Sequence, residues 1–306
     1  MSWVRAFCPK RGFQTGKAAS SGVEAKNQVR TRIPLPVTVL AVLAAATTVV
    51  SGPKDIAIHL TRLGGNSVLA QPYVDSFLRY IESAVGWAPN AMAGSFHVSK
   101  KNAIAYVART QPGIGIMEPP LYFEYRQAWQ LQIILQAESK DLVADQLHLV
   151  VKDPAVKGLA ELKGRRLWTA LADYPRYLSK VVLDGQVDAA SYFTLDSVHN
   201  ALTGARGVLR GDCDAAILDD DQFAKAREME GGKNLRAIYD SPALPPLPVV
   251  VFGAALTAEE RQALARALIG MSGTTEGAAI CRKMHIGRFA EPNTALFGEI
   301  QRRYGE

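Results

Sequence analysis

A short apolar segment, a polar loop and a longer amphipathic segment follow one another near residue 55, and this succession constrains the fold most. Residues 55–60 have the length and apolar character of a buried strand, and the loop at 61–66 contains two glycines. Residues 71–85 then carry apolar side chains three or four positions apart, which predicts a helix with one buried face. Pro72 stands at the predicted start, where proline needs no N–H. The residues predicted for the buried face are Tyr73, Phe77, Ile81 and Ala84.

Strand-like and helix-like segments alternate along the rest of the chain. Such alternation predicts an α/β fold with largely parallel sheets. The predicted strands are 113–117, 129–136, 146–151, 165–171, 215–218, 235–239 and 249–252. The predicted helices are 102–109, 174–183, one that follows a cap at Ser197, and one that begins with the capping box Thr257–Glu260.

The first 50 residues have the pattern of a leader. A basic stretch precedes the apolar segment 35–50, which ends near the small residues Ala44–Ala46. This order is typical of a cleaved secretory signal, and it predicts a periplasmic or secreted protein. The alternative is an uncleaved anchor, although the apolar segment is shorter than the ~20 residues of a membrane-spanning helix.

The charge of the chain lies in this leader. The formal net charge is +6, but residues 1–33 hold seven Lys/Arg and one Asp/Glu, which leaves 28 residues of each sign in the remainder. A formally neutral folded part does not favour nucleic acid as a partner. Of the three cysteines, Cys213 and Cys281 lie beyond the leader, and they either pair or serve as small buried hydrophobic residues.

Two extended segments are candidates for crossings between lobes. One is 147–153, and the other is 241–248, where four prolines disfavour a helix. Extended crossings suit a hinge, because small dihedral changes can bend them. The alternative for the second segment is an ordinary proline-rich loop.

Several short motifs in a fixed order resemble those of the phosphate/phosphonate-type periplasmic solute-binding proteins of ABC transporters. Besides the unit at 55–85, they are the turn at Gln111–Gly115, Leu159–Trp168 with its Leu-Lys-Gly-Arg-Arg sequence, Leu209–Asp219, the proline-rich strand at 241–250, and Thr274–Gly277. The resemblance implies a two-lobed fold of the type II periplasmic-binding-protein kind, each lobe a mostly parallel sheet flanked by helices. The expected division is a leader at 1–50, lobe one at 55–148 plus 249–306, and lobe two at 152–241.

Ligands of open α/β sheets lie beyond the carboxyl ends of strands, and the loops at those ends supply the candidate ligand-binding residues. Most of them have an ordinary structural alternative: Arg62 as a solvated loop charge, Glu118 or Asp219 as a helix cap, and Tyr122 as core packing. The candidates are Arg62, Asn66, Glu118, Tyr122, Asp173, Tyr174, Arg176 and Asp219.

One departure from the family pattern bears on the ligand. The helix after the first strand of lobe two opens, in phosphonate binders, with a cluster of small hydroxyl residues that holds the oxyanion. The corresponding residues here are 171–178, where Asp173 and Tyr174 stand in place of the hydroxyl cluster and Pro175 lacks an N–H. We therefore expect the fold of the family without its ligand.

The sequence shows no catalytic or metal-binding motif. The five histidines never fall in the spacing of a zinc site, and no nucleophile elbow, Walker A sequence or dinucleotide fingerprint is present. We predict no cofactor and no enzymatic activity, and a monomer that binds a small polar molecule, with an ABC permease as the candidate partner. The alternatives are a sensor module of a membrane signalling system and, less favoured, an enzyme on the same fold.

Overall fold

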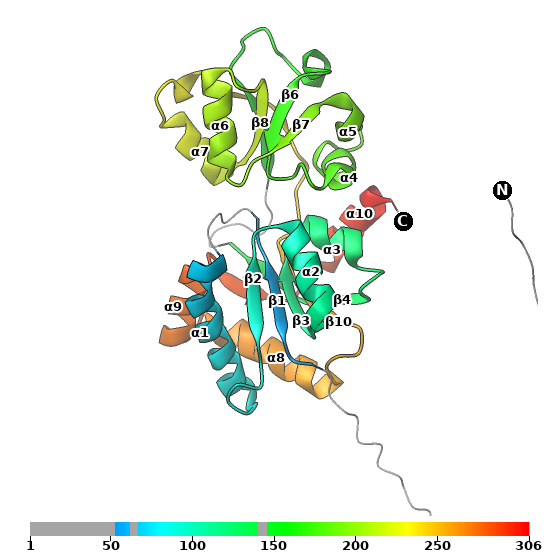
Figure 1. Cartoon of the computed structure of the whole chain (residues 1–306), viewed down its shortest axis with the longest axis vertical. Helices are drawn as coiled ribbons and strands as arrows, with labels where there is room; N and C mark the ends of the chain where they lie inside the picture. Colours follow the sequence, from blue (N-terminus) through cyan, green and yellow to red (C-terminus); the bar gives the residue numbers. More distant parts are fainter. Residues whose placement is uncertain (1–52, 62–66, 140–145, 306) are drawn as a thin grey trace, which may run out of the picture. The chain divides into compact units, whose positions relative to one another are not determined.

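The computed structural model describes residues 53–61, 67–139 and 146–305, and two β-sheets lie within them (Figure 1). The strands of the first sheet, in spatial order, are β11 (Arg288–Ala290), β4 (Leu131–Glu138), β10 (Leu247–Phe252), β3 (Ile114–Met117), β1 (Ile56–His59) and β2 (Gly94–His97). Those of the second are β7 (Thr194–Ser197), β6 (Arg166–Thr169), β8 (Ala215–Asp219), β5 (Leu147–Val151) and β9 (Arg236–Asp240). The predicted α/β class is confirmed.

Both sheets are mixed rather than mostly parallel. In the first, β1 runs parallel to β2 and β3, whereas β10 is antiparallel to both β3 and β4. In the second, β6 runs parallel to β7 and β8, whereas β5 is antiparallel to both β8 and β9. Every antiparallel pair includes a strand that comes just before or just after a change of sheet, namely β4, β5, β9 or β10. Strands β5 and β10, with which the chain enters a sheet, run antiparallel to both of their neighbours.

Strand alternation divides the first sheet into two faces. Ile56 and Ile58 of β1 point to one face, where α1 (Ser67–Val85), α8 (Ala258–Met271) and α9 (Thr275–Lys283) pack. Ala57, between them, points to the other face and packs against α2 (Lys100–Thr110). The short helix α3 (Pro119–Tyr125) follows β3 directly.

The second sheet is covered in the same way. Val150, Ala216 and Leu218 face α6 (Ala201–Arg210) and α7 (Asp220–Arg227). The opposite side packs against α4 (Pro175–Tyr177), the π-helix Leu178–Val182 and α5 (Ala189–Tyr192). The C-terminal helix α10 (Thr294–Tyr304) follows β11 of the first sheet but contacts this π-helix. Two 3-10 turns, Leu159–Leu162 and Gly232–Asn234, complete the elements.

The first helix differs from its prediction at both its start and its face. α1 begins at Ser67, so Pro72 lies inside the helix instead of at its start. Tyr73 is 42% exposed and Ala84 is exposed as well, whereas the buried face consists of Val74, Phe77, Leu78 and Ile81. These four residues have the spacing i, i+3, i+4 and i+7 of an amphipathic helix. Phe77 and Ile81 were predicted correctly, and Val74 and Leu78 take the places of Tyr73 and Ala84 on the buried face.

Two further local predictions are wrong, and one is confirmed. Ser197 ends strand β7, and the helix after it starts at Ala201, where the side chain of Asn200 accepts the N–H of Leu202. The segment 147–153 is not a crossing, because Leu147–Val151 forms β5 within the second sheet. The chain therefore passes between the sheets before Leu147 and again between β9 and β10. The capping box predicted at Thr257 is present at the start of α8.

The two cysteines beyond the leader are unpaired and buried. Cys213 packs in the core between α6 and the second sheet, and Cys281 in the core between α9 and the first sheet. Their separation into two cores excludes the disulfide and leaves the alternative of small buried hydrophobic residues. The leader predicted at 1–50 lies outside the described residues.

Candidate functional site

The carboxyl ends of the parallel strands open onto a cleft between the two sheets. The cleft has a volume of about 740 Å³ and is lined from both sheets, by Leu60 and Glu118 on one side and by Asp219 and Gln222 on the other. The strands set this position: β1 and β3 end at His59 and Met117, and β8 ends at Asp219, whose partner across the antiparallel ladder is Leu147. A site beyond strand ends is where α/β sheets bind their ligands.

A smaller chamber adjoins the cleft. It has a volume of about 40 Å³ and shares Glu118 and Gln222 with the cleft. A space of this size holds about three water molecules, or one small group of a larger ligand. Its other lining residues are Pro119, Pro120, Leu147, Thr169, Ala170, Leu171, Tyr177, Ala201, Ile217, Leu244 and Pro245. Among the described lining residues the chamber is thus mostly apolar, and its polar groups are Glu118, Gln222, Thr169 and the hydroxyl of Tyr177.

Glu118 lies where the cleft and the chamber meet. It follows β3 directly and precedes Pro119, the first residue of α3, so its backbone is extended while its N–H donates to the carbonyl of His59 at 3.0 Å. The side chain is 2% exposed, and its carboxylate accepts a hydrogen bond from the hydroxyl of Thr61. A carboxylate buried at the mouth of a chamber can orient a hydrogen-bond donor of a ligand.

Asp219 reaches the same cleft from the second sheet. Its carboxylate accepts the N–H of Gln222 at 2.8 Å, and the side chain of Gln222 accepts the N–H of Asp219 at 3.0 Å. This reciprocal capping box holds the N-terminus of α7 against the cleft. The structural alternative for Asp219 as a cap is therefore present, and its contact with a ligand stays a prediction.

Tyr122 is a residue of α3 that is buried in the hydrophobic core. The residue is 7% exposed, and its ring packs edge-on against Phe123 and Phe297 at centroid distances of 5.0 and 6.2 Å. Burial raises the pKa of its hydroxyl, which Arg126 partly opposes. Tyr122 lines neither the cleft nor the chamber as described, which favours its structural alternative.

The loop after β6 places its three candidates apart from one another. Asp173 is exposed, and its backbone carbonyl accepts a hydrogen bond from Lys100. Tyr174 is 2% exposed and bonds to His59, while Arg176 is exposed and donates to the carbonyl of Gly305 at 2.7 Å. None of the three lines the cleft or the chamber as described. The remaining candidates, Arg62 and Asn66, lie outside the described residues.

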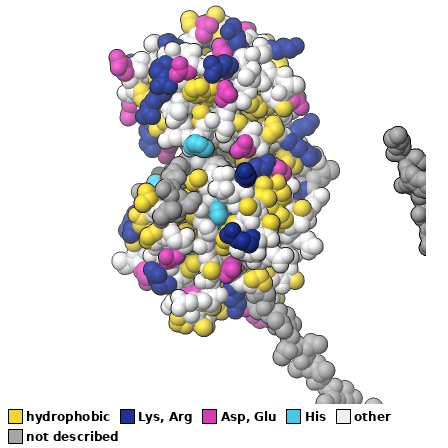
Figure 2. All heavy atoms as spheres, in the orientation of Figure 1, with side chains coloured by type: hydrophobic (Ala, Val, Ile, Leu, Met, Phe, Trp, Pro, Cys, Tyr) yellow, Lys and Arg dark blue, Asp and Glu magenta, His cyan; other side chains and the backbone are white. Residues whose placement is uncertain are grey.

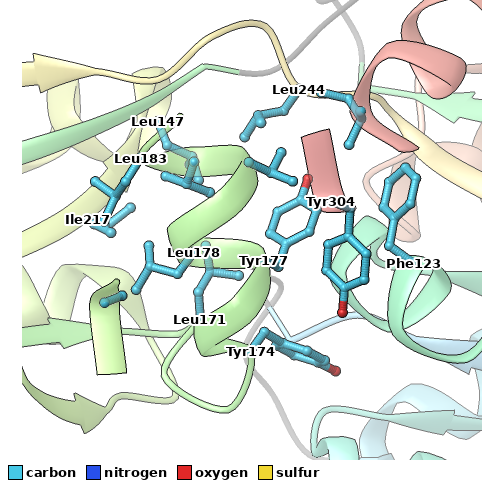
Figure 3. Close-up of a cluster of buried hydrophobic side chains, with 14 of the residues drawn as sticks. Phe123, Leu147, Leu171, Tyr174, Tyr177, Leu178, Leu183, Ile217, Leu244 and Tyr304 are labelled. Atoms are coloured by element: carbon cyan, nitrogen blue, oxygen red, sulfur yellow. The ribbon is translucent and has the colours of Figure 1, made fainter. Parts of the chain in front are cut away.

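The aromatic residues beside this loop join the two halves of the molecule. Figure 3 shows Tyr177, Tyr304 and Phe123 next to one another, and Phe123 and Tyr177 stack with their centroids 6.1 Å apart. The guanidinium of Arg176 lies 4.5 Å from the centroid of the Tyr304 ring. Helix α10 thereby packs against the loop that follows β6.

Sequence reasoning missed Thr169 and Gln222, which line the chamber, Thr61, which bonds to Glu118, and cleft-lining residues such as Asn200, Lys225 and Arg282. Thr61 and Thr169 each follow or end a strand, as the predicted candidates do, so the same rule could have found them. Gln222 was hidden because a capping glutamine is an ordinary helix feature. His59 also ends a strand, so the same rule covers it, whereas Lys100 begins α2 and has no such signal. Both contact the loop after β6 of the second sheet.

The surface of the described part carries charges of both signs. Figure 2 shows Lys and Arg atoms interspersed with Asp and Glu atoms over one face of the molecule. No helix among the described residues has the length and apolar character needed to span a membrane. Among the same residues, no group of three or more His, Cys, Asp or Glu side chains could hold a metal ion.

A family model described as the phosphonate periplasmic substrate-binding protein of ABC transporters matches residues 77–297. The chain belongs to this family. The match confirms the resemblance inferred from the motifs. Members of the family are periplasmic, bind a small solute and work with a permease. No curated protein sequence matches the chain.

Solved structures with the same fold include other members of this kind. A binding-protein component of a phosphonate ABC transporter from Pseudomonas aeruginosa is 15% identical, with a TM-score of 0.60 over 83% of this chain and 85% of its own. A Xanthomonas citri protein bound to ATP is 13% identical, with a TM-score of 0.66 over 82% and 97%. PhnD1 from Prochlorococcus marinus in complex with methylphosphonate is 12% identical, with a TM-score of 0.60 over 82% and 97%. At these identities the likeness concerns the fold alone.

Proposed function

We propose that this substrate-binding protein captures a small polar solute in the cleft between its two sheets and delivers it to an ABC permease. The observation that carries the proposal is the cleft of about 740 Å³, which is lined from both sheets and adjoins the apolar chamber. Glu118 and Asp219 reach it from opposite sides, so a solute that bonds to both favours the approach of the two sheets.

The two sheets are the lobes of this proposal. Lobe one comprises residues near 55–139 and 249–306, and lobe two residues near 146–241. The boundary expected at 148 moves to before Leu147, because β5 pairs with β8 and β9. The segment between β9 and β10 is the proposed hinge in the described part of the chain. A ligand that contacts both lobes shifts the population toward the closed form.

Native mass spectrometry of protein purified without refolding tests the capture of a solute. We expect a bound small molecule whose mass is lost on denaturation, because a closed cleft retains its ligand. The variant Ala170→Phe fills the chamber from a half-buried position and should lose the bound mass. The matched control Ala190→Phe, at an exposed position of α5, should keep it. Equal retention by both variants, or no bound mass in the unmodified protein at any solute supply, would contradict the proposal.

A transport role and a sensing role differ in the partner. Genes for a permease and an ATPase beside the gene for this chain would favour import, whereas a membrane histidine kinase would favour sensing. Turnover of the captured molecule by the purified protein would instead indicate an enzyme on this fold. Import is the role we propose, because the family consists of transporter components.

A further inference from the structure

Tyr174 belongs to the loop of the second sheet but is held by residues of the first. Its hydroxyl lies 2.9 Å from Nε2 of His59, the last residue of β1. The ammonium of Lys100, the first residue of α2, lies 4.5 Å from the centroid of its ring. The same ammonium donates to the carbonyl of Asp173 at 2.8 Å and to the carboxylate of Glu124 in α3 at 2.8 Å.

The hydrogen bonds of His59 define the direction of its bond to Tyr174. Nδ1 of His59 lies 3.1 Å from the carbonyl of His97, which can only accept, so Nδ1 carries the proton. In the neutral ring Nε2 is then an acceptor, and the hydroxyl of Tyr174 donates to it. His59 is 1% exposed, and burial lowers its pKa, which favours this neutral form.

We propose that His59, Lys100 and Tyr174 form a latch that holds the two lobes together and sets the fraction of closed protein. The latch acts on affinity through closure and makes no contact with the solute. Tyr174 is 2% exposed and lines neither cavity as described, so the position is built to contact the other lobe. The inference rests on the proposed closure of the lobes but not on the identity of the solute.

Three contacts join the lobes: the bond between Tyr174 and His59, the ammonium of Lys100 over the Tyr174 ring, and its bond to the carbonyl of Asp173. When the lobes separate, water solvates these groups instead. A hydrogen bond between such groups contributes roughly a factor of 2 to 12 to an equilibrium constant, and a cation above an aromatic ring adds a similar factor. Because apparent affinity scales with the fraction of competent protein, losing one contact from a partly closed population weakens binding by the same order.

Distances between spin labels on the two lobes, measured without any solute, test the latch. Labels are placed by Ser83→Cys on α1 and Arg206→Cys on α6, both exposed, in the full chain with its three native cysteines replaced by alanine. We expect a short-distance population in the parent protein. Tyr174→Phe removes the hydroxyl alone and should raise the ratio of long to short distances about 2- to 12-fold. Lys100→Met should raise the ratio by a similar factor.

Matched controls separate the latch from a general loss of stability. Tyr192→Phe removes a hydroxyl that bonds within lobe two, to the carbonyl of Leu159 at 2.9 Å. Lys152→Met removes an ammonium that bonds within the same lobe, to the carbonyl of Leu209 at 2.8 Å. Neither control should change the distances. In the double variant His59→Phe/Tyr174→Phe the effects should not add, because both variants break one bond.

Two results would overturn the latch. One is a parent protein with only long distances, and the other is a Tyr174→Phe distribution equal to that of Tyr192→Phe. Since the measurement uses no solute, either result leaves solute capture by the cleft as a separate question. Conversely, a latch that shifts the distances in a protein that retains no solute would contradict the proposed function but not the latch.

Discussion

His148 lies between two carboxylates near the proposed hinge. Its Nδ1 is 2.7 Å from the carboxylate of Asp240, the last residue of β9, and its Nε2 is 2.8 Å from that of Asp220 at the start of α7. Burial lowers the pKa of His148, but the hydrogen bonds and charges of the two aspartates outweigh it and raise the pKa above its ordinary value. The imidazolium thus joins β5 to both neighbouring elements.

The raised pKa of His148 predicts a pH dependence of stability. The folded state holds the proton more tightly, so the contribution is complete below the ordinary histidine pKa of about 6.5 and is lost as pH rises through the raised pKa. His148→Asn should lower the free energy of unfolding by about 1–3 kcal/mol at pH 5.5, and by less at pH 8.5. Urea denaturation across this range measures the difference. An equal loss at both pH values, or the same pattern in the exposed His199→Asn, would contradict the assignment.

The candidate residues show which parts of a site follow from the sequence. Glu118 and Asp219 reach one cleft because each stands directly after a strand, and strand ends are readable from apolar runs. Tyr174 was predicted by the same rule, yet the structure turns it toward His59. Tyr174 differs from Glu118 and Asp219 because a residue of the other lobe, His59, binds its hydroxyl. No local sequence pattern predicts such a contact between lobes.

Gly207 sets the distance between α6 and β6. A Cβ at this position would lie 2.6 Å from the ring of Trp168, so the helix approaches the sheet only because the side chain is absent. Gly207→Ala should therefore lower the free energy of unfolding by about 1–3 kcal/mol, despite the better helix propensity of alanine. Gly270→Ala in α8, where a Cβ meets nothing within 4 Å, should instead raise it by about 0.5–1 kcal/mol. Urea denaturation of both variants checks the opposite signs.

The edge strand β11 is attached to the first sheet by a buried carboxylate. Glu138 of β4 is 5% exposed and accepts hydrogen bonds from Arg288 of β11 and Gln136, both at 2.6 Å. The side-chain oxygen of Gln136 in turn accepts the N–H of Asn293, the residue that caps α10. The network thus connects β11 and the C-terminal helix to β4, the neighbouring strand of the sheet.

Removing Arg288 alone should lower the free energy of unfolding more than removing the charges of both Arg288 and Glu138. Arg288→Met leaves a buried carboxylate without its charged donor and should lower the free energy of unfolding by about 1–3 kcal/mol. The double variant Glu138→Gln/Arg288→Met should recover part of this loss, because no charge is then buried. Chemical denaturation measures the stability, and hydrogen exchange of the β11 amides locates the change. A double variant less stable than the single one would contradict this account.

Elements with a local signal are predicted well, and their ends are not. The capping box at Thr257 starts α8 as expected, because its two hydrogen bonds are local. The helix α1 extends upstream past Pro72, and the packing of Val74 and Leu78 against Gly94 of β2 decides which face is buried. The mixed direction of the sheets also escaped prediction, since β5 and β10 return from across the molecule and their direction depends on the whole path of the chain.

For the molecule as a whole, the polar groups of the site determine which charge of solute it accepts. The polar groups of the chamber, among the described residues, are Glu118, Thr169, Gln222 and the hydroxyl of Tyr177. Lys225 and Arg282 line the wider cleft but not the chamber. The hydroxyl of Thr169 accepts the N–H of Leu171 at 3.1 Å, and the side-chain oxygen of Gln222 accepts the N–H of Asp219 at 3.0 Å. The loop after β6 offers Pro175, which has no N–H, in place of a row of donors.

We therefore expect weak or no binding of inorganic phosphate and methylphosphonate. A dianion needs several converging donors, and the carboxylate of Glu118, which is 2% exposed, would disfavour a second negative charge beside it. Titration calorimetry with phosphate, methylphosphonate and 2-aminoethylphosphonate measures this. Sub-micromolar affinity for either of the first two would mean that other donors replace the lost cluster. Tight binding of 2-aminoethylphosphonate alone would remain consistent, because its ammonium can pair with a carboxylate of the cleft, and Glu118→Gln should then weaken that binding at least about tenfold.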